Sequence, residues 1–200
     1  MLKQVEIGQW FFPVKEFPYD ENYIKKYEGY AQTKMGKEIT KLRIELIKSY
    51  NDNPETNLDV GVGSGDIVNA IKCFGYDVNP HMIYKLSKQG QFKNLYTDDL
   101  TEINTISFFD SFEHIEDIDK VLEVCKGKII IISLPIFKGK TIKELKEWKH
   151  YREDEHYHYF TPRGFVNYIE RKGFILLEIS EDEEELGRED IRTFVIQRGN

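Results

Sequence analysis

The sequence predicts an α/β fold built on a mostly parallel, doubly wound sheet of seven strands whose last strand is antiparallel. Three observations support this prediction. Short apolar runs alternate with segments of helical periodicity between residues 57 and 134. The run at residues 128–134 is apolar on both faces, as a central parallel strand requires. A glycine-rich loop joins the first apolar run to the first helical segment, and ligands of such sheets bind beyond the carboxyl ends of the strands.

The bulk composition favours a globular, cytoplasmic protein. The chain has 200 residues, of which 40% are hydrophobic, and we expect a single domain with a lead-in at residues 1–53 and a core at residues 54–200. No apolar run approaches the ~20 residues that cross a bilayer, so a membrane partner is not expected. The net charge of −7 disfavours nucleic acid without excluding it. Cys73 and Cys125 are expected to be reduced core thiols.

The lead-in is predicted to contain two helices. Asp20 is the expected N-cap of the first helix, because tyrosines follow at spacings of three and four residues and share one helix face. Ile39 and Leu42 begin the apolar face of the second helix, which the turn at residues 51–54 ends. The tyrosines of this stripe are Tyr19, Tyr23, Tyr27 and Tyr30.

The core contains seven expected strands with helices between them. Asn79-Pro80 and Thr161-Pro162 are typical helix starts, and Gly173 is a typical helix end. The acidic run at residues 181–185 is expected to be a solvated loop. The last two strands have no helix-length segment between them and are expected to form an antiparallel hairpin. The expected strands lie at residues 57–61, 75–78, 94–97, 105–110, 128–134, 174–179 and 191–197.

The loop after the first strand carries glycines at alternate positions, Gly61, Gly63 and Gly65. Glycines there let the backbone turn sharply and approach a ligand closely. A dinucleotide loop needs Gly-x-Gly-x-x-Gly, but Asp66 occupies the sixth position and its carboxylate would face a pyrophosphate. A ligand without phosphates fits better, and S-adenosyl-L-methionine is such a ligand.

With Asp59 two residues before the first glycine, this loop resembles the first motif of the class I S-adenosylmethionine-dependent methyltransferases, an acidic residue followed by Gly-x-Gly-x-Gly. Asp59, Gly61, Gly63 and Gly65 match that motif position by position. The resemblance covers residues 56–180 and, more loosely, the whole chain. It implies a Rossmann-like fold, S-adenosyl-L-methionine as cofactor, and an N-terminal helical lid in which Tyr23, Tyr27 or Tyr30 covers the donor.

The resemblance extends to the ends of the next two strands. Asp77 ends the second strand, where the family's acidic residue binds the ribose hydroxyls, and Val78 follows it in the expected cofactor site. Asp98 and Asp99 follow the third strand, where an acidic residue of the family approaches the adenine amino group. The sequence does not separate these two aspartates. The segment from the third to the fourth strand is shorter than in the family.

A fourth match follows the fourth strand, where Asp110 precedes the Glu113-His114 pair. In the family this segment lies between the methionine part of the donor and the methyl acceptor. The resemblance therefore places Asp110 in the cofactor site and makes His114 a candidate catalytic residue, while a structural, helix-capping role for His114 stays open.

The connection at residues 135–160 is rich in histidine and aromatic residues, and such loops lie over the strand ends. Three interpretations stay open: a metal site, a general base near neutral pH, or an ordered loop with structural histidines. We assign no metal ligand, and His150, His156 and His158 join His114 as candidate catalytic residues.

Together these features predict an enzyme that transfers a methyl group from S-adenosyl-L-methionine to an unidentified acceptor, with a small molecule, or a modified base or sugar, favoured. Two alternatives belong to other classes. A non-catalytic S-adenosylmethionine-binding regulatory subunit would also keep Asp59 and Asp77. A nicotinamide-dependent oxidoreductase is disfavoured by Asp66.

Overall fold

The computed structural model describes residues 3–14 and 21–198, and these residues form two compact units. The glycine-loop unit comprises residues 18–109 and 128–131. The histidine-loop unit comprises residues 1–17, 110–127 and 132–200. The expected Asp20 cap and Tyr19 lie outside the described residues, as does the side chain of Tyr23.

A six-stranded sheet has the order β4-β3-β5-β6-β9-β8. It is mostly parallel with antiparallel β9, and this confirms the predicted fold class. A separate three-stranded sheet has the order β1-β2-β7. Strand β6 (Ile129–Pro135) belongs to both units, since its first three residues lie in the glycine-loop unit and the rest in the histidine-loop unit.

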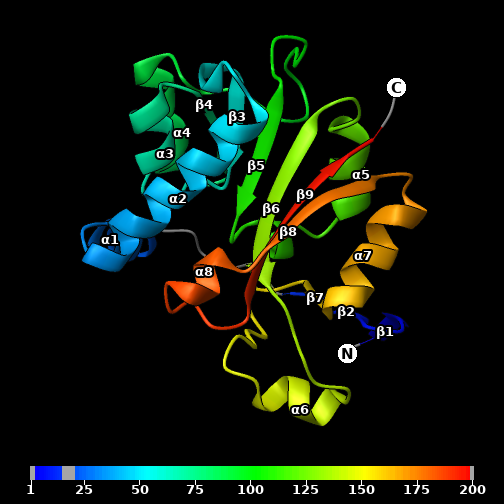
Figure 1. Cartoon of the computed structure of the whole chain (residues 1–200). Coiled ribbons are helices and arrows are strands. Elements are labelled where there is room, and N and C mark those ends of the chain that lie inside the picture. Colours follow the sequence, from blue (N-terminus) through cyan, green and yellow to red (C-terminus); the bar gives the residue numbers. More distant parts are fainter. Residues whose placement is uncertain (1–2, 15–20, 199–200) are drawn as a thin grey trace. The chain divides into compact units, whose positions relative to one another are not determined.

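In the glycine-loop unit, helices flank three parallel strands (Figure 1). Asn79 caps α4 by accepting the amide hydrogen of His81 at 2.9 Å, with Pro80 in the first turn, as predicted. The strands are β3 (Asn57–Val60), β4 (Phe74–Tyr76) and the fully buried β5 (Thr105–Phe109). The helices are α1 (Glu21–Ala31), α2 (Lys34–Tyr50), the 3-10 turn η1 (Pro54–Thr56), α3 (Asp66–Ile71) and α4 (Pro80–Gln89).

The strand expected at residues 94–97 does not form, so the main sheet has six strands within the described residues instead of seven. The amide of Asn94 donates to Asp98 at 2.8 Å and the amide of Tyr96 donates to Asn94 at 2.9 Å. Local side-chain oxygens thus accept hydrogen bonds from the backbone amides that would pair with a neighbouring strand. Phe92 alone forms an isolated parallel bridge, to Gly75.

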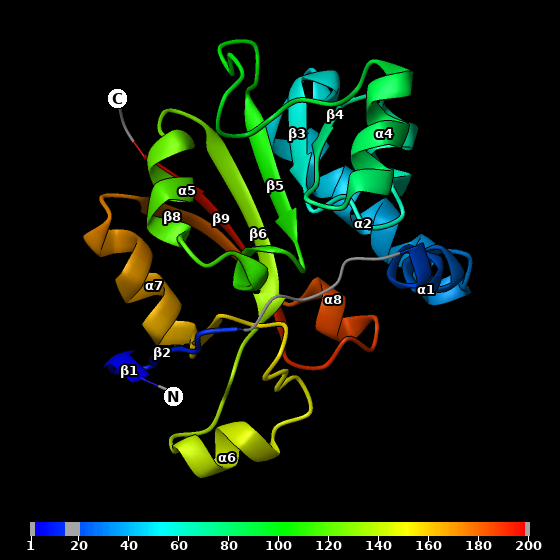
Figure 2. The ribbon, with the colours of Figure 1, turned by 180° about the vertical axis from the view of Figure 1, so that it is seen from behind.

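The histidine-loop unit contains strands that the sequence did not indicate. Strands β1 (Lys3–Glu6) and β2 (Gln9–Phe11) form a hairpin that precedes the two lead-in helices in the sequence. Strand β2 pairs antiparallel with β7 (His158–Phe160), inside the segment expected to be irregular. Figures 1 and 2 show the hairpin beside the start of α7 (Pro162–Arg171), where the amide of Thr161 donates to the carbonyl of Gly8 at 2.8 Å.

Helix α7 begins and ends where predicted, with Thr161 as N-cap and Gly173 in the left-handed region at φ +81°. Strands β8 (Ile175–Ser180) and β9 (Ile191–Gln197) form the predicted antiparallel hairpin. The acidic run was wrongly expected to be a solvated loop, because it forms α8 (Asp182–Glu185) and Glu183 is buried. The remaining elements are η2 (Phe112–His114), α5 (Ile118–Val124) and α6 (Ile142–Glu147).

Candidate functional site

The glycine loop adopts the backbone conformation that its composition predicts. Gly61, Gly63 and Gly65 have φ values of +77°, +54° and +80°, a region in which a Cβ atom is strained. The amide of Gly61 donates to the carbonyl of Tyr76 at 2.8 Å, and that of Gly65 to the carbonyl of Val62 at 2.8 Å. The loop therefore turns tightly from β3 into α3, and among the described residues only the Tyr27 side chain comes close to Gly63.

Asp59 precedes this loop on β3 and is buried, with 3% of its surface exposed. Its carboxylate accepts a hydrogen bond from the Ser107 hydroxyl at 2.7 Å. Burial raises the pKa of Asp59 to about 7, against the lowering effects of the Ser107 bond and the Arg43 charge. The nearby Asp77 carboxylate adds to the increase. Asp59 thus exchanges a proton near neutral pH.

Asp77 follows β4 and faces the glycine loop. Its Oδ1 accepts the amide hydrogen of Asn79 at 2.8 Å, and it also accepts backbone hydrogen bonds from Val62 and Val78. Burial raises the pKa of Asp77, and the three backbone donors oppose that increase. Asp77 is therefore fixed between the glycine loop and α4, whereas the Val78 side chain is exposed.

Helix α1 lies against the glycine loop. A Cβ atom at Gly63 would lie 3.8 Å from Cδ1 of Tyr27, so the Tyr27 ring stands beside the loop backbone. Lys85 on α4 reaches the Ser64 carbonyl at 3.4 Å and the Glu28 carboxylate at 3.9 Å. The structure therefore brings Tyr27 to the residues that the sequence assigned to the donor.

Asp98 and Asp99 are exposed and bind their own turns. Asp98 accepts the amide of Asn94, and Asp99 accepts both the amide and the hydroxyl of Thr101 at 2.9 and 3.0 Å. The Thr101 bonds are the main cause of the lowered pKa of Asp99. Either role at the adenine stays a prediction.

In the histidine-loop unit, His114 and His156 lie together. Their ring centroids are 4.6 Å apart and the rings are nearly perpendicular. The Nδ1–H of His114 donates to the Glu155 carbonyl at 3.0 Å, which fixes its tautomer because a carbonyl only accepts. Burial lowers the pKa of His114 to about 4 and that of His156 to about 2, so both rings are neutral near pH 7.

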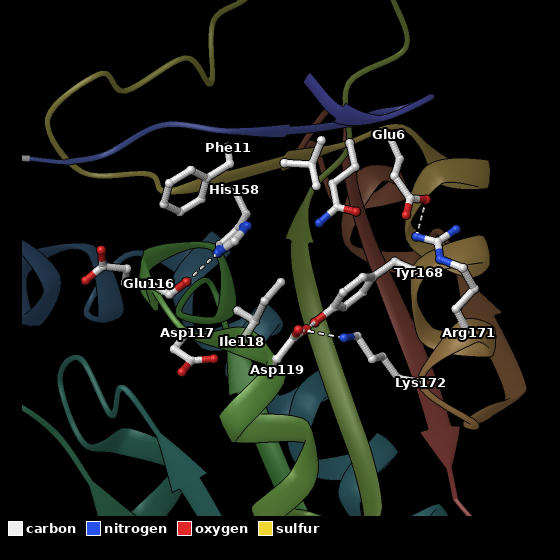
Figure 3. Close-up of a pocket in the computed structure, with 12 residues that line it drawn as sticks. Glu6, Phe11, Glu116, Asp117, Ile118, Asp119, His158, Tyr168, Arg171 and Lys172 are labelled. Atoms are coloured by element: carbon white, nitrogen blue, oxygen red, sulfur yellow. Dashed lines mark hydrogen bonds and ion pairs between the residues drawn. The ribbon is translucent and has the colours of Figure 1, made fainter. Parts of the chain in front are cut away.

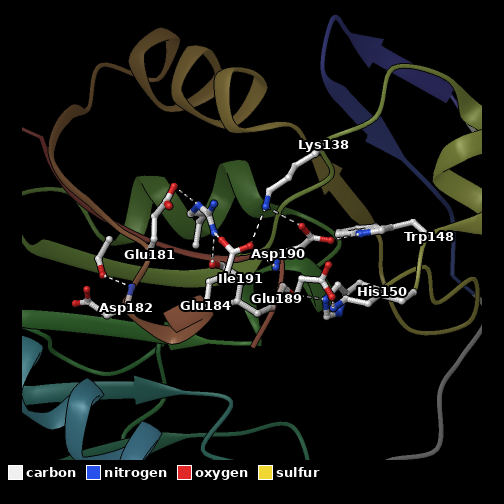
Figure 4. Close-up of polar contacts among 12 residues, drawn as sticks. Lys138, Trp148, His150, Glu181, Asp182, Glu184, Glu189, Asp190 and Ile191 are labelled. Atoms are coloured by element: carbon white, nitrogen blue, oxygen red, sulfur yellow. Dashed lines mark hydrogen bonds and ion pairs between the residues drawn. The ribbon is translucent and has the colours of Figure 1, made fainter. Parts of the chain in front are cut away.

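The other two candidate histidines bind different segments. His150 donates to the Glu189 carbonyl at 2.8 Å and stacks edge-on against Trp148, beside the Lys138–Asp190 ion pair (Figure 4). His158 donates to the Glu116 carbonyl at 3.0 Å. Within the described residues, His150, His156 and His158 do not form the metal cluster that the sequence left open.

His158 lines a pocket of about 520 Å³ within the histidine-loop unit (Figure 3). Some of the charged side chains around it pair with one another. Asp119 accepts from the Tyr168 hydroxyl at 2.7 Å and binds Lys172 at 2.6 Å, and Arg171 binds Glu6 at 2.5 Å. Glu116 and Asp117 also line the pocket, so its lining carries more acidic than basic side chains.

Asp110 has a left-handed backbone, with φ +56°, and binds Arg188 through two parallel hydrogen bonds of 2.9 and 3.0 Å. Arg188 also pairs with the buried Glu183, which accepts from the Ser133 hydroxyl at 3.0 Å. No signal in the sequence points to Arg188, because an arginine after an acidic run belongs to no motif. Asp110 is thus a paired carboxylate, and its role at the donor stays a prediction.

Comparison with known proteins identifies the family. The model of a methyltransferase domain family matches residues 27–179, so the chain belongs to that family. The expected class, the S-adenosylmethionine-dependent methyltransferases, is thereby confirmed. No curated protein matches the chain by sequence. Within the described residues, no helix is long and apolar enough to cross a membrane.

Three solved structures illustrate the shared fold. A S-adenosylmethionine-dependent methyltransferase from Clostridium acetobutylicum has a TM-score of 0.59 and 12% identity, covering 90% of this chain and 100% of its own. A possible histamine N-methyltransferase from Thermotoga maritima has values of 0.60 and 15%, with coverages of 90% and 97%. A Burkholderia thailandensis 1,6-didemethyltoxoflavin-N1-methyltransferase, solved with that compound and S-adenosylhomocysteine, has values of 0.52 and 11%, with coverages of 100% and 99%.

Proposed function

We propose that this methyltransferase binds S-adenosyl-L-methionine at the glycine loop and transfers its methyl group to a small-molecule acceptor. The observation that carries the proposal is the positive φ of all three loop glycines, with Asp59 and Asp77 fixed on either side. This arrangement offers close-approaching backbone and two carboxylates to a ligand that has hydroxyl and ammonium donors and lacks phosphates.

Asp77 is the proposed ribose ligand. An ionised carboxylate accepts hydrogen bonds from both ribose hydroxyls, and the three backbone donors already favour its ionised form. Asp59 is the proposed partner of the methionine part, where a positive ligand charge would favour its ionised form and lower its pKa below about 7. Tyr27 is the proposed cover of the donor, since its ring already stands beside Gly63.

Methyl transfer from a sulfonium is an in-line displacement in which the carbon–sulfur bond breaks as the acceptor's bond to carbon forms. The protein mainly aligns the two reactants and excludes water. A base is required only where the acceptor carries a proton that it must lose. The four candidate histidines keep their proposed role as acceptor contacts, while burial lowers the pKa of His114 and His156 and makes these two rings weak bases.

A small acceptor is favoured by two named neighbours. One is a possible histamine N-methyltransferase and the other a 1,6-didemethyltoxoflavin-N1-methyltransferase, and both of the compounds named are small molecules. The net charge of −7 adds weak support, because a nucleic acid acceptor needs cationic surface. A cytoplasmic location belongs to the same proposal.

Calorimetry with S-adenosylhomocysteine tests the donor site. Asp77→Ala removes charge-assisted hydrogen bonds of about 1.5–3 kcal/mol each, so we expect the affinity to fall by about tenfold or more. Asp52→Ala, which removes an exposed aspartate at the end of α2, is the matched control and keeps full affinity. Unchanged affinity in Asp77→Ala would refute the ribose assignment.

A further inference from the structure

Glu113, His114 and His156 form a cluster with the composition of a transition-metal site. One donor atom of each side chain lies within 4.8 Å of the others. Ligands at about 2.1 Å from Zn²⁺ and at tetrahedral angles lie about 3.4 Å apart, so small side-chain rotations close the cluster around an ion. All three residues belong to the histidine-loop unit, and Glu113 and His156 are buried.

We propose that Glu113, His114 and His156 bind one divalent first-row transition-metal ion. Two imidazoles and a carboxylate are the donor set that Zn²⁺ and the neighbouring divalent ions prefer. Three protein ligands leave coordination positions open for an oxygen or nitrogen atom from outside the chain. This site goes beyond the proposed donor site, since it shares no residue with the glycine loop.

His114 is already oriented as a metal ligand. Its Nδ1–H donates to the Glu155 carbonyl, so its Nε2 carries the lone pair. Histidine ligands of metals typically donate their second ring nitrogen to a carbonyl or carboxylate in this way. The backbone supports the same arrangement, because the amide of Tyr157 donates to the Glu113 carbonyl at 2.9 Å and joins the two segments that carry the cluster.

His156 supplies the second, independent observation. The exposed fraction of this residue is 7%, so it is 93% buried. Its Nδ1 makes no hydrogen bond within the described part of the chain. A buried nitrogen without a partner is costly, and an ion bound there would satisfy it.

The charges around the cluster are mixed. Asp110 acts on both imidazoles as a negative charge, although it is paired with Arg188. Arg152 acts on His156 as a positive charge, and its guanidinium donates to the Lys149 and Tyr151 carbonyls. Among the three cluster residues, Glu113 is the one with an acidic side chain. Its negative charge, when ionised, neutralises part of the charge of a bound divalent cation.

Metal binding by the full chain tests the proposal. Protein stripped with a chelator is titrated with Zn²⁺, and separately with Mn²⁺, in competition with a chromophoric chelator. We expect one ion per wild-type chain and at least about a tenfold loss of affinity in His156→Ala and in Glu113→Gln. His150→Ala removes a histidine of the same loop that lies outside the cluster, and it keeps wild-type affinity.

Two further readouts keep the outcome decisive. The metal should raise the melting temperature of the wild type and of His150→Ala but not that of Glu113→Gln, a nearly isosteric variant chosen to preserve the fold. S-adenosylhomocysteine affinity should be unchanged in all three variants, which separates this proposal from the donor site. A wild-type chain that binds donor product but no stoichiometric metal, or equal metal loss in His150→Ala, overturns the metal site.

Discussion

The buried Asp59 carboxyl should make the stability of the chain depend on pH. An unfolded aspartate has a pKa near 3.8, whereas burial raises the pKa of Asp59 to about 7. Between these values the folded chain holds a proton that the unfolded chain has released. Stability is therefore greatest below pH 3.8 with respect to this group, falls as the pH rises, and levels off above about 7.

The magnitude follows from the difference between the two pKa values. Each pH unit corresponds to about 1.4 kcal/mol, so ionisation of Asp59 lowers the free energy of unfolding by about 4 kcal/mol at pH 8. Asp59→Asn removes this group while its side-chain oxygen still accepts from Ser107. The variant should thus gain up to about 4 kcal/mol over the wild type at pH 8.

Urea denaturation of the wild type and Asp59→Asn at pH 5 and pH 8 measures the effect. The gain in the variant should be larger at pH 8, and taking the difference between the two proteins cancels the other titrating groups. Asp98→Asn changes an exposed aspartate and is the control, with no such pH-dependent gain expected. A gain that does not grow between pH 5 and pH 8 would refute a raised pKa for Asp59.

Two further predictions concern packing and charge. Gly75→Ala puts a Cβ atom 2.8 Å from Cγ1 of Val62, so we expect overpacking to cost about 1–3 kcal/mol of unfolding free energy in a urea titration; an unchanged midpoint would contradict this. Glu183→Gln leaves Arg188 with a single carboxylate partner, and we expect a loss of about 3 kcal/mol at most in thermal melts, with Glu185→Gln as the neighbouring control.

Local signals in the sequence predicted the parts of the fold that local forces determine. The caps Asn79 and Thr161 accept the amide hydrogens of their own helices, and both helices begin where these residues indicate. The glycine spacing likewise predicted the loop, because positive φ at Gly61, Gly63 and Gly65 is a local property of the backbone.

Features that depend on distant residues were missed or misassigned, as was one feature that depends on competing local hydrogen bonds. Asn94 and Asp98 turned an expected strand into a capped turn, and the competition between these two outcomes cannot be resolved from composition. Glu183 looked like one more surface acid, but Arg188 and Ser133 bind it in the interior. Glu113 and His156 are 43 positions apart, so only the folded chain shows that they can act together.

The hairpin of β1 and β2 has a consequence for how the chain folds during synthesis. Trp10 pairs with Tyr159, so β2 is synthesised almost 150 residues before its partner strand β7. Pairing between such distant strands slows folding, because the entropy cost of closing a large loop comes before the favourable contacts that compensate it. Trp10 and Phe12 are buried in the folded chain, and before β7 is synthesised this burial is incomplete. Until β7 appears, they form an apolar surface that a chaperone would recognise.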